Sequence, residues 1–110
     1  MMGGEFAGRL RERIAIEALT QERNAIGAQL PEWSVVARCL AVVAPEGVGA
    51  EAEGQALSAM ARFKVIIRVR DGVSVGQRVR WGARLLAVRQ RADDPALPDR
   101  ILLRCEEIRT

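Results

Sequence analysis

The sequence predicts a small all-β domain, a six-stranded barrel or sandwich with one long connection between its second and third strands. Short runs rich in Val, Ile and Leu alternate apolar with polar residues, as half-buried strands do. Clusters of Gly and Pro separate these runs, and only residues 50–61 have a composition compatible with a helix. Because the chain has 110 residues and 49% of them are apolar, we expect residues 1–110 to form a single domain with one core.

The first two predicted strands are residues 13–19 and 33–43. Alternation in the first strand gives it two faces, with Ile14, Ile16 and Ala18 on one and Arg13, Ala15 and Glu17 on the other. The second run is largely apolar and is interrupted by Arg38, which predicts a strand covered on much of both faces. Trp33 falls on a face of this strand that is assigned to the core.

The third predicted strand, residues 62–70, alternates cleanly. One face holds Phe63, Val65, Ile67 and Val69, and the other holds Lys64, Ile66, Arg68 and Arg70. A half-buried strand is expected, with the apolar face toward the core.

A hairpin follows, in which Gly82 and Ala83 link residues 79–81 to residues 84–86. Gly at the first central position supplies the positive φ of a type II′ turn. In that register Trp81 faces Arg84, so the guanidinium would lie near the indole ring as a cation–π pair. The apolar side of this hairpin is then Val79, Trp81, Leu86 and Val88. A last strand, residues 100–108, places Ile101, Leu103 and Cys105 together.

The connection at residues 45–61 is unusually long for a compact domain, and long loops tend to be functional or disordered. Residues 50–61 are rich in Ala, Glu and Gln but contain Gly54, so they form either one short helix or a long loop. Glu46, Glu51 and Glu53 are the charged residues of this connection.

The composition argues against an enzyme, a cofactor and a metal site. The chain has no His and no Tyr, which removes the commonest general base and the commonest transition-metal ligand. Cys39 and Cys105 each stand alone, so we expect buried small hydrophobes in preference to a disulfide or a reactive thiol. The sequence shows neither the order of a signal peptide nor an uncharged run long enough for a membrane helix, which predicts a soluble protein of the cytoplasm without membrane contact.

Charge is unevenly distributed along the chain. Residues 1–61 carry a net charge of −3, residues 62–91 a net +8, and residues 92–110 a net −2. Alternation places seven basic side chains on the polar faces of strands expected to be adjacent: Lys64, Arg68, Arg70, Arg78, Arg80, Arg89 and Arg91. Three interpretations remain open, namely a solvated face, contact with acidic protein, and contact with DNA phosphates. Few aromatics are present, and Phe63, Trp33 and Trp81 are assigned to the core, which weakens a module that stacks bases.

The ordered set of motifs resembles the phage head–tail joining family, also described as head-closure or stopper proteins. Residues 8–16 resemble its N-terminal strand, and Trp81-Gly82-Ala83-Arg84 resembles a later hairpin. Other matching positions are Arg23, Gly27, Trp33, Ala41, Pro45, Gly49-Ala50-Glu51, Gly72-Val73 and Arg78-Val79. The similarity covers residues 8–107, and it departs from the family's pattern at Asn24, Ile26 and Leu40. The arginine- and alanine-rich character also fits the phage-derived gene transfer agents of some bacteria.

The resemblance implies a structural head–tail connector that is made in the bacterial cytoplasm and placed at the neck of a virion or phage-like particle. Such proteins form a ring, here of six or twelve copies, between the portal-side adaptor and the tail terminator or other tail proteins, and they surround the DNA channel. Non-specific contact with packaged double-stranded DNA is a further implied partnership. The long loop would reach the channel or a neighbouring ring through Glu46, Val48, Glu51, Glu53, Leu57 and Met60. The alternative is a small β-barrel that binds nucleic acid through its arginine-rich face.

Overall fold

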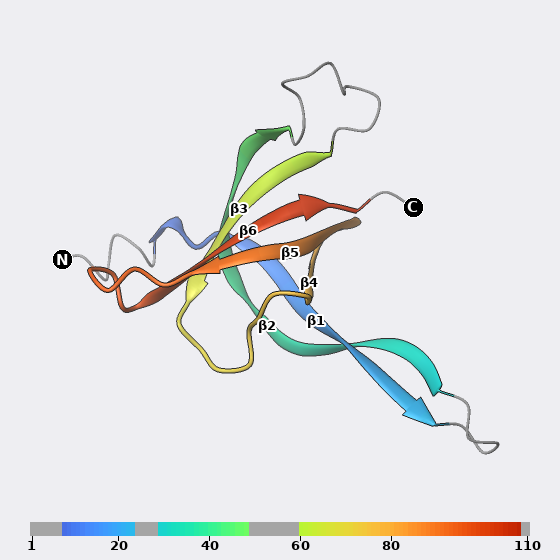
Figure 1. The fold of residues 1–110 in the computed structure, drawn as a ribbon. Coiled ribbons are helices and arrows are strands. Elements are labelled where there is room, and N and C mark those ends of the chain that lie inside the picture. The colour runs from blue at the N-terminus through green and yellow to red at the C-terminus, as the bar shows by residue number, and fades with distance from the viewer. Residues whose placement is uncertain (1–7, 24–28, 49–59, 109–110) are drawn as a thin grey trace.

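The protein folds as a closed barrel of six antiparallel strands, which confirms the predicted fold class (Figure 1). The computed structural model describes residues 8–23, 29–48 and 60–108. The strands are β1 (Glu12–Arg23), β2 (Gln29–Val48), β3 (Ala61–Arg68), β4 (Arg78–Trp81), β5 (Arg84–Ala92) and β6 (Arg100–Glu107). Their order around the barrel is β1-β2-β3-β6-β5-β4. Among the described residues no helix is long and apolar enough to cross a membrane.

The core fills the barrel with the alternate side chains of the strands. Its largest fully buried members are Ile16, Ile67, Leu86, Ile101, Leu103, Val65, Val79 and Val88. Burial of each such side chain contributes roughly 1.5–3 kcal/mol of transfer free energy. The domain therefore has a core of its own.

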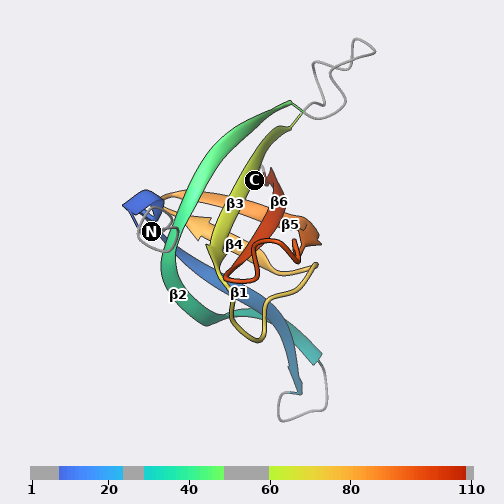
Figure 2. The same ribbon diagram turned by 90° about the vertical axis from the view of Figure 1, so that its left-hand side faces the viewer.

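The longest element, β2, serves two neighbours in succession. From Gln29 to Ala41 it pairs with β1, and from Val42 to Val48 it pairs with β3. Beyond Glu17, β1 no longer pairs with β4, so residues 18–23 and 29–34 form a two-stranded ribbon, here called the β1–β2 arm. Figures 1 and 2 show this arm projecting from the barrel, with the other end of β2 on the opposite side of the molecule.

A β-bulge in β2 explains one wrong prediction. Ile16 pairs with Ala37 but Glu17 pairs with Val35, so Val36 is an extra residue in β2. The bulge exchanges the inward-facing and outward-facing positions of β2. Ala37 and Ala41 are buried, whereas Val35, on the other side of the bulge, is exposed. Trp33, which was predicted to face the core, consequently lies half-buried outside the core cluster.

The other strand predictions differ mainly at their ends. Val69 is exposed and not in the core, because β3 ends at Arg68. The hairpin register is confirmed, with Trp81 paired with Arg84 and Val79 with Leu86. The φ of Gly82 is +61°, the positive value that the turn requires.

Both cysteines are free thiols. Cys105 is buried, and desolvation raises its pKa to about 12, so it behaves as the expected small hydrophobe. Cys39 is half-buried, and desolvation raises its pKa as well, although the nearby Arg70 acts in the opposite direction.

Candidate interaction surfaces

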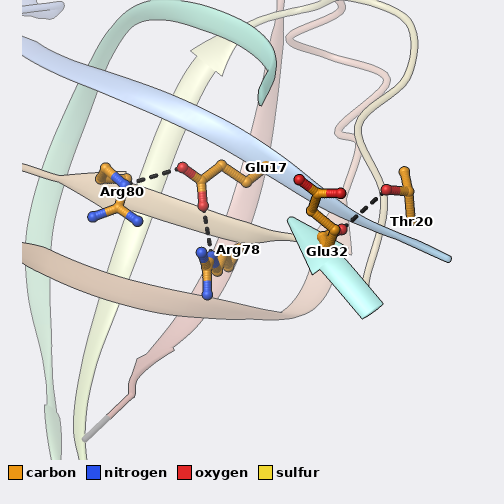
Figure 3. Close-up of polar contacts among 5 residues, drawn as sticks. All are labelled: Glu17, Thr20, Glu32, Arg78 and Arg80. Atoms are coloured by element: carbon orange, nitrogen blue, oxygen red, sulfur yellow. Dashed lines mark hydrogen bonds and ion pairs between the residues drawn. The ribbon is translucent and has the colours of Figure 1, made fainter. Parts of the chain in front are cut away.

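A buried carboxylate lies where β4 meets β1. The residue is Glu17, which is only 6% exposed. Its Oε1 accepts a hydrogen bond from Arg78 Nε at 2.6 Å, and its Oε2 accepts one from Arg80 Nε at 3.0 Å. Figure 3 shows the carboxylate between the two guanidinium groups. Desolvation raises the pKa of Glu17, but the two arginines outweigh it, so the pKa lies below its ordinary value.

Trp33 extends this ion pair to a third strand. The guanidinium carbon of Arg78 lies 4.2 Å from the centre of the Trp33 ring, which is a cation–π contact. Arg78 belongs to β4, Glu17 to β1 and Trp33 to β2. These three residues, with Arg80, are here called the Glu17 clamp. The clamp ties the base of the β1–β2 arm to the barrel.

A second cluster of side chains lies beside the hairpin between β4 and β5, where Arg84 meets two aromatic rings. The Arg84 guanidinium is 4.8 Å from the Phe63 ring centre and 5.1 Å from that of Trp81, which confirms the predicted Arg84–Trp81 pair. Arg84 also forms a 2.8 Å ion pair with Glu107. The two rings meet edge to face, with centroids 5.5 Å apart. Trp81 Nε1 donates a hydrogen bond to Glu12, so this group joins five strands, β1, β3, β4, β5 and β6.

The seven predicted basic residues do not form one face across adjacent strands, and that expectation is corrected. Lys64 and Arg68 belong to β3, Arg78 and Arg80 to β4, and Arg89 and Arg91 to β5, while Arg70 follows β3. The strands β4 and β5 are neighbours, but β3 and β4 are separated by two strands on either side of the barrel. A strand next in sequence is not always next in the sheet, and charge counting along the chain ignores that difference.

Most of these basic side chains have acidic partners within the chain. Arg78 and Arg80 bind Glu17, and Arg89 and Arg91 form ion pairs with Glu106 and Asp93. Lys64 is half-buried on β3 and lies opposite Arg104 of β6. The net charge of residues 62–91 therefore overstates the positive charge that the barrel presents to a partner.

The predicted loop residues are only partly described. Glu46 is exposed near the end of β2 and forms an ion pair with Arg104. Val48 is the last residue of β2, and Met60 is half-buried immediately before β3. The positions of Glu51, Glu53 and Leu57 lie outside the described residues.

Two arginines that do not belong to the predicted basic surface lie on the outer face of β1 and β2. Arg13 and Arg38 are exposed, and together with Arg80 they line a shallow groove beside Ala15 and Leu40. Alternation does place Arg13 and Ala15 outward. Arg13 and Arg38 nevertheless belong to residues 1–61, whose net charge is negative, so the charge count gave no sign of a basic site there. No cluster of metal-ligating side chains occurs in the described part of the chain.

Comparisons with known proteins place this fold among phage proteins. The sequence model of a family described as phage head completion protein matches residues 7–108. A protein of Shigella flexneri 2a, solved in solution, is 26% identical with a TM-score of 0.68, over 91% of this chain and 94% of that one. A chain in the virion of a native gene transfer agent particle has a TM-score of 0.69 over 91% of this chain and 96% of its own length. At 18% identity, that likeness shows the fold alone. No curated protein matches the chain.

Proposed function

Because this chain belongs to the phage head completion protein family, we propose that it closes the DNA-filled head of a tailed-phage-like particle as a head–tail connector. Its copies form a ring around the DNA channel at the neck, between the portal-side adaptor and the tail. The protein acts by binding and not by catalysis. Its partners are further copies of itself and the structural proteins above and below the ring.

The observation that carries this proposal is the path of β2. One strand runs from the tip of the β1–β2 arm to the far side of the barrel, where it pairs with β3. Its two ends lie on opposite sides of the molecule (Figure 2). A connector needs contacts on two sides, and a barrel with its own core can hold both contact regions in a fixed relation.

The decisive experiment removes the gene and examines the particles by electron microscopy. We expect filled or leaking heads separated from finished tails, with normal particles restored by the wild-type gene. Normal particles in the absence of the protein would overturn the proposal. Reproducible hydrolase or nuclease turnover, abolished by one acidic substitution, would overturn the claim that the protein acts by binding.

A loop replacement tests the contact at the β3 end of β2. Within the proposal, residues 45–61 reach the channel or a neighbouring ring through their acidic and apolar side chains. Replacing residues 49–59 with a short Gly-Ser linker leaves the strand pairs up to Val48 and Ala61 in place. We expect thermal unfolding to change little and head closure or tail attachment to fail. Normal assembly of the variant would show a passive surface loop.

Substitution of Arg68, at the end of β3, and of Arg70, just after it, tests whether protein or DNA contacts this basic surface in the particle. If acidic protein covers them, Arg68→Glu combined with Arg70→Glu blocks docking and leaves the fold intact. If DNA faces them, docking survives and genome retention becomes sensitive to salt. Cosedimentation with head particles and release of DNA at increasing salt separate the two outcomes.

A further inference from the structure

The outer face of β1, between β2 and β4, carries a groove with arginines on both sides. Ala15 of β1 pairs with Arg38 of β2 on one side and with Arg80 of β4 on the other. Adjacent strands lie 4.7–4.9 Å apart, so the two arginine backbones are separated by about 10 Å across a small side chain. Two residues earlier on β1, Arg13 pairs with Leu40. The groove is thus lined by three cations and by Leu40, its exposed large apolar residue.

No acidic side chain lines this groove, in contrast to the groove in which Glu46 and Glu106 lie among arginines. Within the described ranges, Arg13 and Arg38 have no ion-pair partner. Arg80 donates its Nε to Glu17, and its side chain remains 45% exposed. In Figure 3 the terminal nitrogens of Arg80 point away from Glu17. Arg13 and Arg38 have no counter-charge within the described ranges and Arg80 keeps exposed donors, so an anionic ligand would gain from all three.

We propose that this three-arginine groove binds an extended acidic segment of a partner protein, with a carboxylate over Ala15 and an apolar side chain on Leu40. Arginine binds carboxylates through two parallel hydrogen bonds, and the Glu17 clamp holds Arg80 in place for this role. Leu40 is 45% exposed, and it follows Arg38, the residue paired with Ala15, by two positions on β2, about 7 Å along that strand. That spacing equals the distance between residues i and i+2 of an extended peptide.

The exposed leucine favours protein over nucleic acid as the ligand. A DNA backbone offers phosphates and sugars, which need cations but make no use of a large exposed apolar side chain. An acidic residue followed two positions later by Leu, Ile or Phe uses every part of the groove. The arginine stems add further apolar contact beneath such a segment. The inference stands apart from the proposed ring, because it concerns binding by a single copy.

The test is a fluorescence anisotropy titration of the full chain against a labelled ten-residue peptide that alternates Glu and Leu with Ser spacers. We expect a Kd of roughly 10⁻⁴ M, weakened by added salt. The double variant Arg13→Gln and Arg38→Gln should weaken binding at least tenfold. The matched variant Arg62→Gln, which removes one exposed arginine from β3, should change it less than twofold.

Two further measurements identify the site and the ligand class. Amide chemical shifts of Ala15, Arg38 and Leu40 should move on titration, and a peptide with Lys in place of Glu should move none of them. Unchanged affinity in the double variant would overturn the proposal. A short DNA duplex could instead bind more tightly than the peptide and lose this binding in the double variant. That result would overturn the choice of protein as the ligand. Circular dichroism of each variant checks that the fold is kept.

Discussion

The Glu17 clamp and the ion pairs of β5 and β6 use the same chemical groups in different surroundings. The Arg78–Glu17 and Arg91–Asp93 contacts are 2.6 Å and 2.8 Å long, but the side chain of Glu17 is 8% exposed whereas that of Asp93 is 54% exposed. In the clamp, loss of one partner leaves a cation with little water to replace it. At the exposed pairs, water and salt replace the lost partner readily. Burial therefore decides which arginines hold the barrel together.

The largest expected effect comes from removing the charge of the clamp. Glu17→Gln keeps the size of the side chain but leaves Arg78 and Arg80 without a counter-charge. We expect the free energy of unfolding to fall by about 2 kcal/mol, because Arg80 is partly exposed and recovers some solvation. Urea denaturation followed by circular dichroism measures the change. A loss no larger than that of an exposed pair would show that the clamp is not specially coupled to the fold.

Acidification should reversibly remove the contribution of the ionised Glu17 to the free energy of unfolding. The pKa of Glu17 in the folded protein lies below its ordinary value of 4.5, so folding favours the charged form. Its contribution is complete above pH 4.5 and is lost as the pH falls through the lowered pKa. Asp93 and Asp99, whose pKa values are also lowered by their arginines, act in the same direction. The difference in stability between the wild type and Glu17→Gln should therefore shrink below pH 4.5; a constant difference would contradict the assignment to Glu17.

Removal of the aromatic face tests the third member of the clamp. Trp33→Leu keeps an apolar side chain but deletes the ring beneath Arg78. We expect a loss of about 1 kcal/mol, and a smaller loss for Trp33→Phe, which retains a ring. Equal losses in the two variants would assign the effect to packing area and not to the cation–π contact.

The smallest effect belongs to the exposed pair between β5 and β6. Glu106→Gln breaks the 3.3 Å contact with Arg89, whose side chain is 65% exposed. We expect a change of less than about 1 kcal/mol, within reach of the same urea titration. A loss as large as that of Glu17→Gln would mean that burial does not separate the two regions.

The fold was largely predictable from alternation, because alternate residues of β3, β4 and β6 point into the core. The hairpin at Gly82 was predictable in register as well, since the turn type fixes which residues face each other. Trp33 was assigned to the wrong face because nothing in residues 33–43 reveals the extra residue at Val36. Bulges arise from how two strands pair, and a single strand's sequence carries little trace of that.

The candidate surfaces were less predictable than the fold. Assigning Lys64 and Arg80 to neighbouring strands failed, because the order of strands in the barrel differs from their order in the chain. The partnership of Glu17 with Arg78 and Arg80 joins residues more than sixty positions apart. Such contacts follow from closure of the barrel, which is a property of the whole chain.

Closure of the barrel depends on a short seam, since β1 and β4 share only the register from Ala15 to Glu17. If that seam opened, β1 and β4 would become the two free edges of an open sheet, and free edges pair readily with other chains. The Glu17 clamp spans the seam, so its ion pairs also oppose the exposure of these two edges. Solubility during storage and stability against urea would then depend on the same carboxylate.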